Sequence, residues 1–344
     1  MVDVTVMGAG AFGLSVAWAC IQRGAKVQVI DPNGVAAGAS GGIVGALAPH
    51  TPENWNDKKA FQFESLIMAR QFWPKVESVG GKASGYGSTG RLQPIVDTRA
   101  LELAHRRSEN ALTLWQGKAT WQVLPANSAD TWSPQSVTGF LIKDSLSARI
   151  HPRMACEALA AAILAKGGRI STDAQPKGAV VWATGWQGLT ELSTELGRPI
   201  GNGVKGQAIL LKYNQSLMPQ LFADSVHMVP HIDGTVAIGS TSEREFDDPT
   251  STDAQIDLVL ARAIEAVPSL AKAPILRRWA GVRPRAKSRA PMLGAHPTRP
   301  KDYIANGGFK IGFGMAPKVG EVMADLILEN RDTIPEPFKP SASL

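Results

Sequence analysis

The hydrophobic positions near the start of the chain form two short apolar runs with a helical segment between them. Residues 2–7 and 26–30 are rich in β-branched side chains, as buried strands are. Between them, apolar residues recur at helical spacing over residues 14–22. This order predicts a strand–helix–strand unit and therefore a parallel sheet.

Later segments alternate between helical and strand-like patterns. Residues 178–185 read as a strand that enters a glycine turn, and residues 204–240 show strand-like alternation. Within that stretch, Asp233-Gly234 separates two apolar runs, as in a β-hairpin. Amphipathic helices are expected over residues 61–76, 101–115, 152–167, 253–267 and 317–330. Parallel and antiparallel pieces alternate along the chain, so we expect two interleaved, discontinuous domains.

Three glycines follow the first predicted strand and open the first predicted helix. Gly8, Gly10 and Gly13 form the pattern GxGxxG, which allows a tight turn, close approach to a pyrophosphate and close helix–strand packing. Asp31 ends the second strand, where a carboxylate accepts hydrogen bonds from a ribose and repels a 2′-phosphate. The pattern predicts a dinucleotide site that disfavours NADP and leaves NAD and FAD open.

The chain after Asp31 is small and rich in glycine over residues 38–49. Such a backbone can lie against a large flat ligand and donate amide hydrogens to it, whereas a flexible loop is the simpler interpretation. The following motifs, in this order, make the chain similar to the D-amino-acid-oxidase superfamily of flavoproteins: GxGxxG, Ala39-Ser40-Gly41, Val181–Trp186, Val204–Gln207, Ile238–Thr241, Trp279–Pro284 and Gly308–Gly312. Glycine oxidase and the flavin domain of the bacterial tRNA wobble-uridine modification enzyme are the members it most resembles.

The resemblance implies an α/β fold in which a Rossmann-like FAD-binding domain is interleaved with an α+β substrate domain on a mainly antiparallel sheet. The FAD-binding domain is expected over residues 1–50, 145–203 and 281–335, and the substrate domain over residues 51–144 and 204–280. The residues expected to contact FAD are Gly8, Gly10, Ala11, Phe12, Gly13, Asp31, Ser40, Gly45, Ala46, Leu47, Ala174, Ala183, Thr184, Gly185, Trp186, Gly308, Phe309, Lys310, Ile311 and Gly312.

The resemblance also implies an activity: FAD-dependent oxidation of the C–N bond of an amino acid or a related carboxylate-bearing amine. Hydride would pass to flavin N5, and water would hydrolyse the resulting imine. Arg283 is expected to hold the substrate carboxylate, because a guanidinium meets a carboxylate with two parallel hydrogen bonds. The last helix, expected to begin at Ala316-Pro317, would direct its positive end toward the flavin.

Three further residues are candidates for the catalytic site. Lys310 stands where glycine oxidase leads us to expect an arginine, and His227 where that family has a tyrosine. His227 is a candidate proton acceptor near neutral pH or a structural histidine. His50 is a candidate for substrate contact or proton transfer. No metal is predicted, because His227 and His231 stand about 13 Å apart on an extended strand.

Composition limits the class of protein. The 344 residues include 44% hydrophobic and 19% charged side chains, which excludes a disordered chain. Two separated cysteines, Cys20 and Cys156, form neither a disulfide framework nor a metal site. We expect no membrane span and no signal peptide, and hence a cytoplasmic location.

The positive charge is concentrated in one part of the sequence. The net charge is +6, yet residues 275–320 contain ten Lys or Arg and the single acid Asp302. Because this stretch includes Arg283 and Lys310, we expect a field focused on the site and a small anionic substrate. The alternative function is a flavoenzyme acting on the carboxymethylaminomethyl group of a tRNA wobble uridine, in which case the charge would serve RNA.

Overall fold

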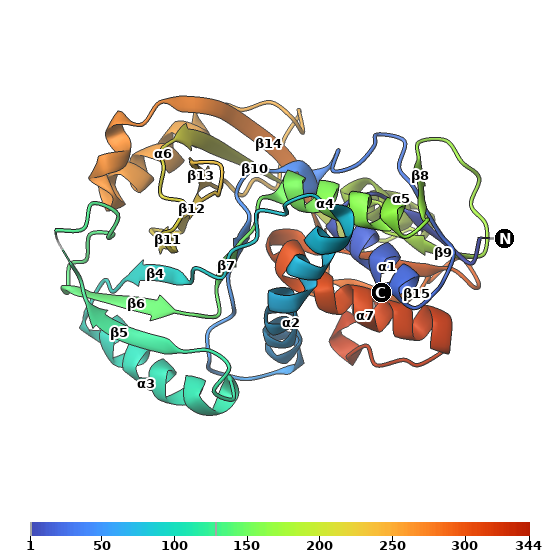
Figure 1. Ribbon diagram of the computed structural model, residues 1–344, viewed down its shortest axis with the longest axis horizontal. Helices are drawn as coiled ribbons and strands as arrows, with labels where there is room; N and C mark the ends of the chain where they lie inside the picture. Colours follow the sequence, from blue (N-terminus) through green and yellow to red (C-terminus); the bar gives the residue numbers. More distant parts are fainter. Residues whose placement is uncertain (1, 128) are drawn as a thin grey trace.

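The computed structural model describes residues 2–127 and 129–344 and contains two large β-sheets. Figure 1 shows one sheet with most of the helices on one side of the molecule and the second sheet on the other. The six-stranded sheet has the order β15-β16-β9-β1-β2-β8, and the eight-stranded sheet the order β14-β10-β13-β12-β11-β4-β6-β5. The α/β fold with a parallel and a mainly antiparallel sheet is therefore confirmed.

The six-stranded sheet is parallel except at one edge. Its strands are β1 (Val4–Met7), β2 (Val27–Ile30), β8 (Arg169–Ser171), β9 (Ala179–Trp182), β15 (Met292–Ala295) and β16 (Tyr303–Asn306), of which β15 runs antiparallel to β16. Val4 lies beside both Val27 and Ala179, so β1, β2 and β9 end together at Met7, Ile30 and Trp182. Ligands of open α/β sheets bind at this edge, outside the carboxyl ends of the strands.

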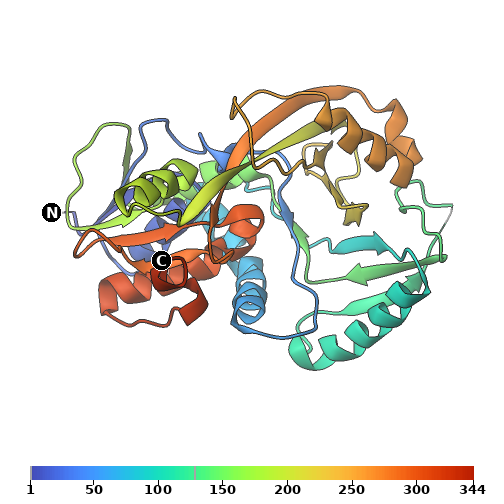
Figure 2. The same ribbon diagram turned by 180° about the vertical axis from the view of Figure 1, so that it is seen from behind.

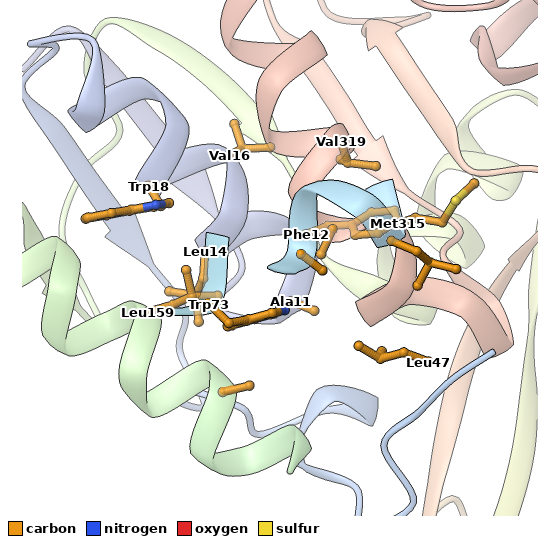
Figure 3. Close-up of a cluster of buried hydrophobic side chains, with 14 of the residues drawn as sticks. Ala11, Phe12, Leu14, Val16, Trp18, Leu47, Trp73, Leu159, Met315 and Val319 are labelled. Carbon is orange, nitrogen blue, oxygen red and sulfur yellow. The ribbon is translucent and has the colours of Figure 1, made fainter. Parts of the chain in front are cut away.

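Helices cover this sheet in two layers. In the first layer α1 (Ala11–Gln22), α4 (Pro152–Ala165) and α7 (Gly312–Glu329) contact the strands, and α1 packs against both α4 and α7. In the second layer α2 (Asp57–Gly80) packs on α4 and α7. Figure 3 shows Leu14, Trp73, Leu159 and Met315, one from each helix, in the same cluster. Trp73 is fully buried. Burying a side chain of this size contributes on the order of 2–3 kcal/mol. This core fixes the start of α1 relative to α7.

The eight-stranded sheet is built from two halves. One half contains β10 (Gly201–Lys212), β11 (Gln220–Ala223), β12 (Val226–Pro230), β13 (Thr235–Gly239) and β14 (Ile275–Ala286). The other half contains β4 (Arg91–Pro94), β5 (Trp121–Pro125) and β6 (Phe140–Asp144). The halves meet at a short parallel pairing of β11 with β4, Gln220 with Arg91 and Leu221 with Leu92. The expected hairpin at Asp233-Gly234 is present between β12 and β13.

The remaining elements connect or cover these sheets. A short ladder of β3 (Ala46–Leu47) with β7 (Ala148–Arg149) lies between them. Helix α3 (Thr98–Leu114) covers β5, and α6 (Gln255–Ala266) covers β10 and β13. Helix α5 (Gly185–Glu195) packs on β10 and β14, and Figure 2 shows these two long strands from behind.

The last helix was expected to begin at Ala316-Pro317, but it begins at Gly312, and both residues lie buried inside it. The sequence suggested otherwise because Pro317 and the glycines before it are weak helix formers. The domain boundaries stay a prediction, and β10 and β14 run across positions 203 and 280. Within the described residues, no helix combines the length and apolar character needed to cross a bilayer.

Candidate active site

A cavity of about 1090 Å³ lies between the two sheets. At one end it is lined by Met7, Ile30 and Asp31, at the carboxyl edge of the six-stranded sheet. At the other end it is lined by Phe222, His227 and Arg283 of the eight-stranded sheet. A single elongated ligand can therefore contact both sheets, which is the geometry that a two-domain cofactor enzyme needs.

The glycine turn between β1 and α1 has no room for side chains. A Cβ on Gly8 would lie 2.3 Å from the carbonyl oxygen of Ala183, and Gly8 has φ +113°. A Cβ on Gly13 would lie 2.0 Å from the carbonyl oxygen of Gly8, so Gly13 sits behind the cavity wall and lets α1 pack on the turn. Gly10, Ala11 and Phe12 line the cavity at the start of α1, where the first amides have no acceptor within the helix, which suits a pyrophosphate.

Side chains from later segments complete this turn. Asp31 accepts a hydrogen bond from the amide of Ala9 at 2.8 Å and another from Asn33 at 3.0 Å, while its carboxylate lines the cavity. Ser40 Oγ accepts from the amide of Ala11 at 3.0 Å. Asp31 thus holds the glycine turn in place and keeps lone pairs for a ribose hydroxyl.

Most of the expected FAD contacts line this cavity, and four do not. Gly13 lies behind the wall, while Leu47 and Ile311 line a smaller neighbouring pocket. Ala174 lines neither pocket, because the loop that carries it folds against β2, where Gln28 Nε2 donates to the carbonyl of Gln175 at 2.9 Å. The expected residues on the main cavity wall are Gly8, Gly10, Ala11, Phe12, Asp31, Ser40, Gly45, Ala46, Ala183, Thr184, Gly185, Trp186, Gly308, Phe309, Lys310 and Gly312.

The cavity wall fits FAD by the chemistry of its donors. Backbone amides and small residues surround the end near Asp31, and the start of α7 at Gly312 and Phe313 lines the opposite part. The positive end of α7 therefore reaches the cavity from Gly312, four residues before Ala316. A glycine-lined cradle with two helix N-termini suits a ligand that carries a pyrophosphate and a ring that becomes anionic on reduction.

Arg283 of β14 is held by neutral acceptors. Its guanidinium donates to the carbonyl oxygen of Thr241 at 2.8 Å and that of Lys205 at 3.4 Å, and to Ser240 Oγ at 3.3 Å. Among the described residues no carboxylate lies within ion-pair distance of it. Desolvation lowers the pKa of Arg283 to about 10, so the side chain keeps its charge at neutral pH. An anion in the cavity would supply the missing counter-charge.

Gly206 makes room for this arginine. On β10, Gly206 pairs with Gly281 of β14, and a Cβ there would lie 1.4 Å from one terminal nitrogen of Arg283. The guanidinium therefore lies across the β10 backbone where a side chain is absent. A glycine within a strand is the sequence signal that could have indicated this contact, because it often marks a place where another group approaches the backbone closely.

His227 does not fit the expected role of a proton acceptor near neutral pH. Desolvation, with the charges of Arg91 and Lys310, lowers the pKa of His227 to about 3. The ring is neutral above that pH and packs on Phe222 with 4.5 Å between centroids. Its buried Nδ1 has no hydrogen-bond partner among the described residues. A neutral imidazole at the cavity wall can bind a ligand group but is a weak base.

A smaller pocket of about 190 Å³ adjoins the main cavity. The two share Ala46, Phe222, His227 and Lys310. His50 lines the smaller pocket, and its backbone amide donates to Gln62 Oε1 at 2.7 Å. Burial lowers the pKa of His50, and its Nδ1 is also directed at Gln62 Oε1. Sequence reasoning missed Gln62 and Arg91, which also line this pocket and belong to segments without a family motif.

The basic stretch 275–320 is less focused on the site than expected. Of its ten cationic residues, Arg283 and Lys310 line the cavity, whereas Arg278, Arg299 and Lys318 form ion pairs with Asp257, Glu195 and Glu64. On β14, Arg278 and Arg283 are an odd number of residues apart and so point to opposite faces of the sheet, while Arg299 lies in the β15–β16 connection and Lys318 in α7. The smaller pocket gains Arg91 instead, from a different part of the chain.

Comparison with known proteins agrees with this geometry. Residues 3–326 match the family model described as FAD dependent oxidoreductase. The chain belongs to this family. It is 26% identical to a glycine oxidase of Pseudomonas putida over 99% of both chains. It is also 27% identical to the bifunctional protein ThiO/ThiG of Nostoc sp. This match covers 96% of this chain but only 53% of that relative's length.

Solved structures of this family share the fold. The crystal structure of iminodiacetate oxidase from Chelativorans sp. superposes with a TM-score of 0.86 at 22% identity, covering 98% of this chain and 99% of the other. The glycine oxidase of Geobacillus kaustophilus gives a TM-score of 0.81 at 20% identity, covering 98% and 97%. The family match confirms the flavoprotein family expected from the sequence motifs, and these structures show that the fold is shared.

Proposed function

We propose that this chain binds FAD in the main cavity and oxidises the carbon–nitrogen bond of a small amino acid or a related amine that carries a carboxylate. The observation that carries the proposal is Arg283, a partly buried cation at the cavity wall with neutral acceptors and no paired carboxylate. Membership of the FAD-dependent family and the glycine cradle support the cofactor.

The residues of this chain would bind and orient the substrate. Arg283 would hold the carboxylate, and orientation of the adjacent C–H bond toward the cofactor supplies much of the rate enhancement in such a reaction. Bound flavin would accept the hydride from that carbon, after which water hydrolyses the imine product. Gly206 leaves the space that the guanidinium occupies. The start of α7 would stabilise negative charge that develops nearby.

The test uses purified protein and a panel of amino acids and amines. We expect a yellow protein whose flavin absorbance bleaches without oxygen when a carboxylate-bearing amine is added, and recovers when oxygen is admitted or an artificial electron acceptor is supplied. A control amine that lacks the carboxylate should bleach the flavin much more slowly. A flavin that no amine or amino acid reduces would contradict the proposal.

A further inference from the structure

The smaller pocket beside the main cavity has a positively charged wall. It lies where the two halves of the eight-stranded sheet meet, and Arg91 of β4 and Phe222 of β11 come from the two sides of that junction. Lys310 reaches it from the turn before α7. No aspartate or glutamate is among the residues that line it. Two cations thus face a space that is large enough only for a small group.

Arg91 is paired with a buried carboxylate but keeps hydrogen-bond donors free, whereas Lys310 has no counter-charge among the described residues. The Nε of Arg91 donates to Asp144 at 2.9 Å, and no hydrogen bond among the described residues uses its terminal nitrogens. Lys310 is exposed and makes no ion pair within the described part of the chain. Desolvation and the charge of Arg283 lower the pKa of Lys310. An acidic ligand group would relieve this excess of positive charge.

His227 adds a polar atom that lacks a partner. Its Nδ1 is buried, and the ring lines both the main cavity and the smaller pocket. Since the ring is neutral, Nδ1 is free to carry the single proton and donate it to an acceptor. A buried polar group without a partner is costly, so a ligand oxygen there would be favourable.

The two cationic groups of the site share an aromatic neighbour. The Arg283 guanidinium lies 5.9 Å and Lys310 Nζ 5.7 Å from the centroid of the Phe309 ring. Both cations also line the main cavity, so one ligand there can contact Arg283 and Lys310, the second at the mouth of the smaller pocket.

We propose that the smaller pocket is a second anion subsite, formed by Arg91, His227 and Lys310, which selects amine substrates that carry a second acidic group. The inference rests on the proposed function, because Arg283 is taken to hold the first carboxylate. The substrate class is then an amino or imino acid with two acidic groups. A carboxylate and a phosphate share the chemistry required, and the experiment distinguishes them.

Binding of ligands that cannot be oxidised tests the subsite without requiring turnover. Succinate, its monoamide succinamate and phosphonoacetate are titrated into the purified flavoprotein, with affinity read by calorimetry and by perturbation of the flavin spectrum. We expect succinate to bind about 10- to 100-fold more tightly than succinamate, as expected for one charge-assisted contact. Tighter binding of phosphonoacetate than succinate would assign the subsite to a phosphate-like group.

Variants separate this pocket from general charge effects. Lys310→Met should reduce the succinate-to-succinamate ratio to near unity, Lys310→Arg should restore it, and His227→Phe should lower it several-fold. Lys287→Met removes the same charge from an exposed position that lines neither pocket, so it should leave the ratio unchanged. Arg91 is left intact, because its removal would leave Asp144 buried without its partner.

Two results would overturn the subsite: equal affinity for succinate and succinamate in the unmodified protein, or an unchanged ratio in Lys310→Met. Failure of the proposed function looks different. If dicarboxylates bind selectively but no amine bleaches the flavin, the subsite stands and the proposed oxidation is wrong. If monocarboxylic amino acids bleach the flavin and succinate shows no preference, the oxidation stands and the subsite is wrong.

Discussion

The two ends of the main cavity are built in different ways. The end at β1 and α1 consists of glycines, backbone amides and one carboxylate that holds the turn. The end at the eight-stranded sheet consists of long cationic and aromatic side chains, such as Arg283, Phe309 and Lys310. The first end tolerates no added atoms, whereas the second depends on charge. Substitutions should therefore separate loss of cofactor from loss of substrate.

The largest effect is expected at the glycine turn. In Gly8→Ala the new methyl group would meet the Ala183 carbonyl at 2.3 Å, in a backbone conformation with φ +113°. We expect at least a 100-fold loss of FAD affinity, measured by flavin fluorescence after gel filtration. Gly38→Ala is the matched control, because it lies on the same wall with nothing within 4 Å of its added Cβ. Equal flavin content in both variants would show that the turn at Gly8 does not hold the flavin.

Loss of Arg283 should leave the cofactor in place. Arg283→Ala removes the cation assigned to the substrate carboxylate, and we expect kcat/KM to fall by roughly 100- to 1000-fold, chiefly through KM, because charged hydrogen bonds of this kind are strong. Flavin content should match that of the unmodified protein. Arg283→Lys keeps the charge without the two-pronged geometry and should recover only part of the loss. An unchanged KM would show that Arg283 does not bind the substrate carboxylate.

A smaller change at Gly206 should act through the same arginine. Because a Cβ at Gly206 would lie 1.4 Å from the guanidinium, Gly206→Ala should displace Arg283 and raise KM by about 10-fold with little change in the stability of the flavin complex. The double variant Gly206→Ala with Arg283→Ala should be no worse than Arg283→Ala alone. Additive losses would show that Gly206 acts independently of the arginine.

A further effect concerns stability and its dependence on pH. His231 is buried between His151, Arg149 and Asp233, and its Nε2 lies 2.7 Å from the Ile43 carbonyl oxygen. Burial lowers the pKa of His231 to about 4. The unfolded state therefore binds the proton first as the pH falls, and the free energy of unfolding should drop by roughly 2 kcal/mol between pH 7 and pH 5.

Denaturant titrations at several pH values measure this dependence. His231→Gln should reduce the slope between pH 7 and pH 5 and leave the part contributed by His227, although it lowers stability at every pH. His105→Gln on the exposed face of α3 is the matched control and should keep the slope. An identical slope in all three proteins would show that the acid sensitivity has another source.

The same comparison explains what the sequence could predict. The glycine turn, Asp31 and the hairpin at Asp233-Gly234 are local, because backbone geometry at each site demands particular residues nearby in sequence. Arg283 came from family motifs. Arg91 and Gln62 could not be found, since each becomes part of the site only when distant strands and helices pack together. The neutral state of His227 likewise depends on tertiary burial and on neighbouring charges that sequence spacing does not reveal.

The strand order of the parallel sheet has a consequence for how the protein is made. Strand β1 pairs with β9, and β9 in turn pairs with β16, so neighbouring strands are separated by more than a hundred residues of chain. During synthesis, the first glycine turn emerges early but lacks its neighbours. The sheet at the proposed cofactor site cannot be completed until residues 303–306 have left the ribosome. Until then the apolar strands β1 and β2 lack part of their sheet and are prone to aggregate.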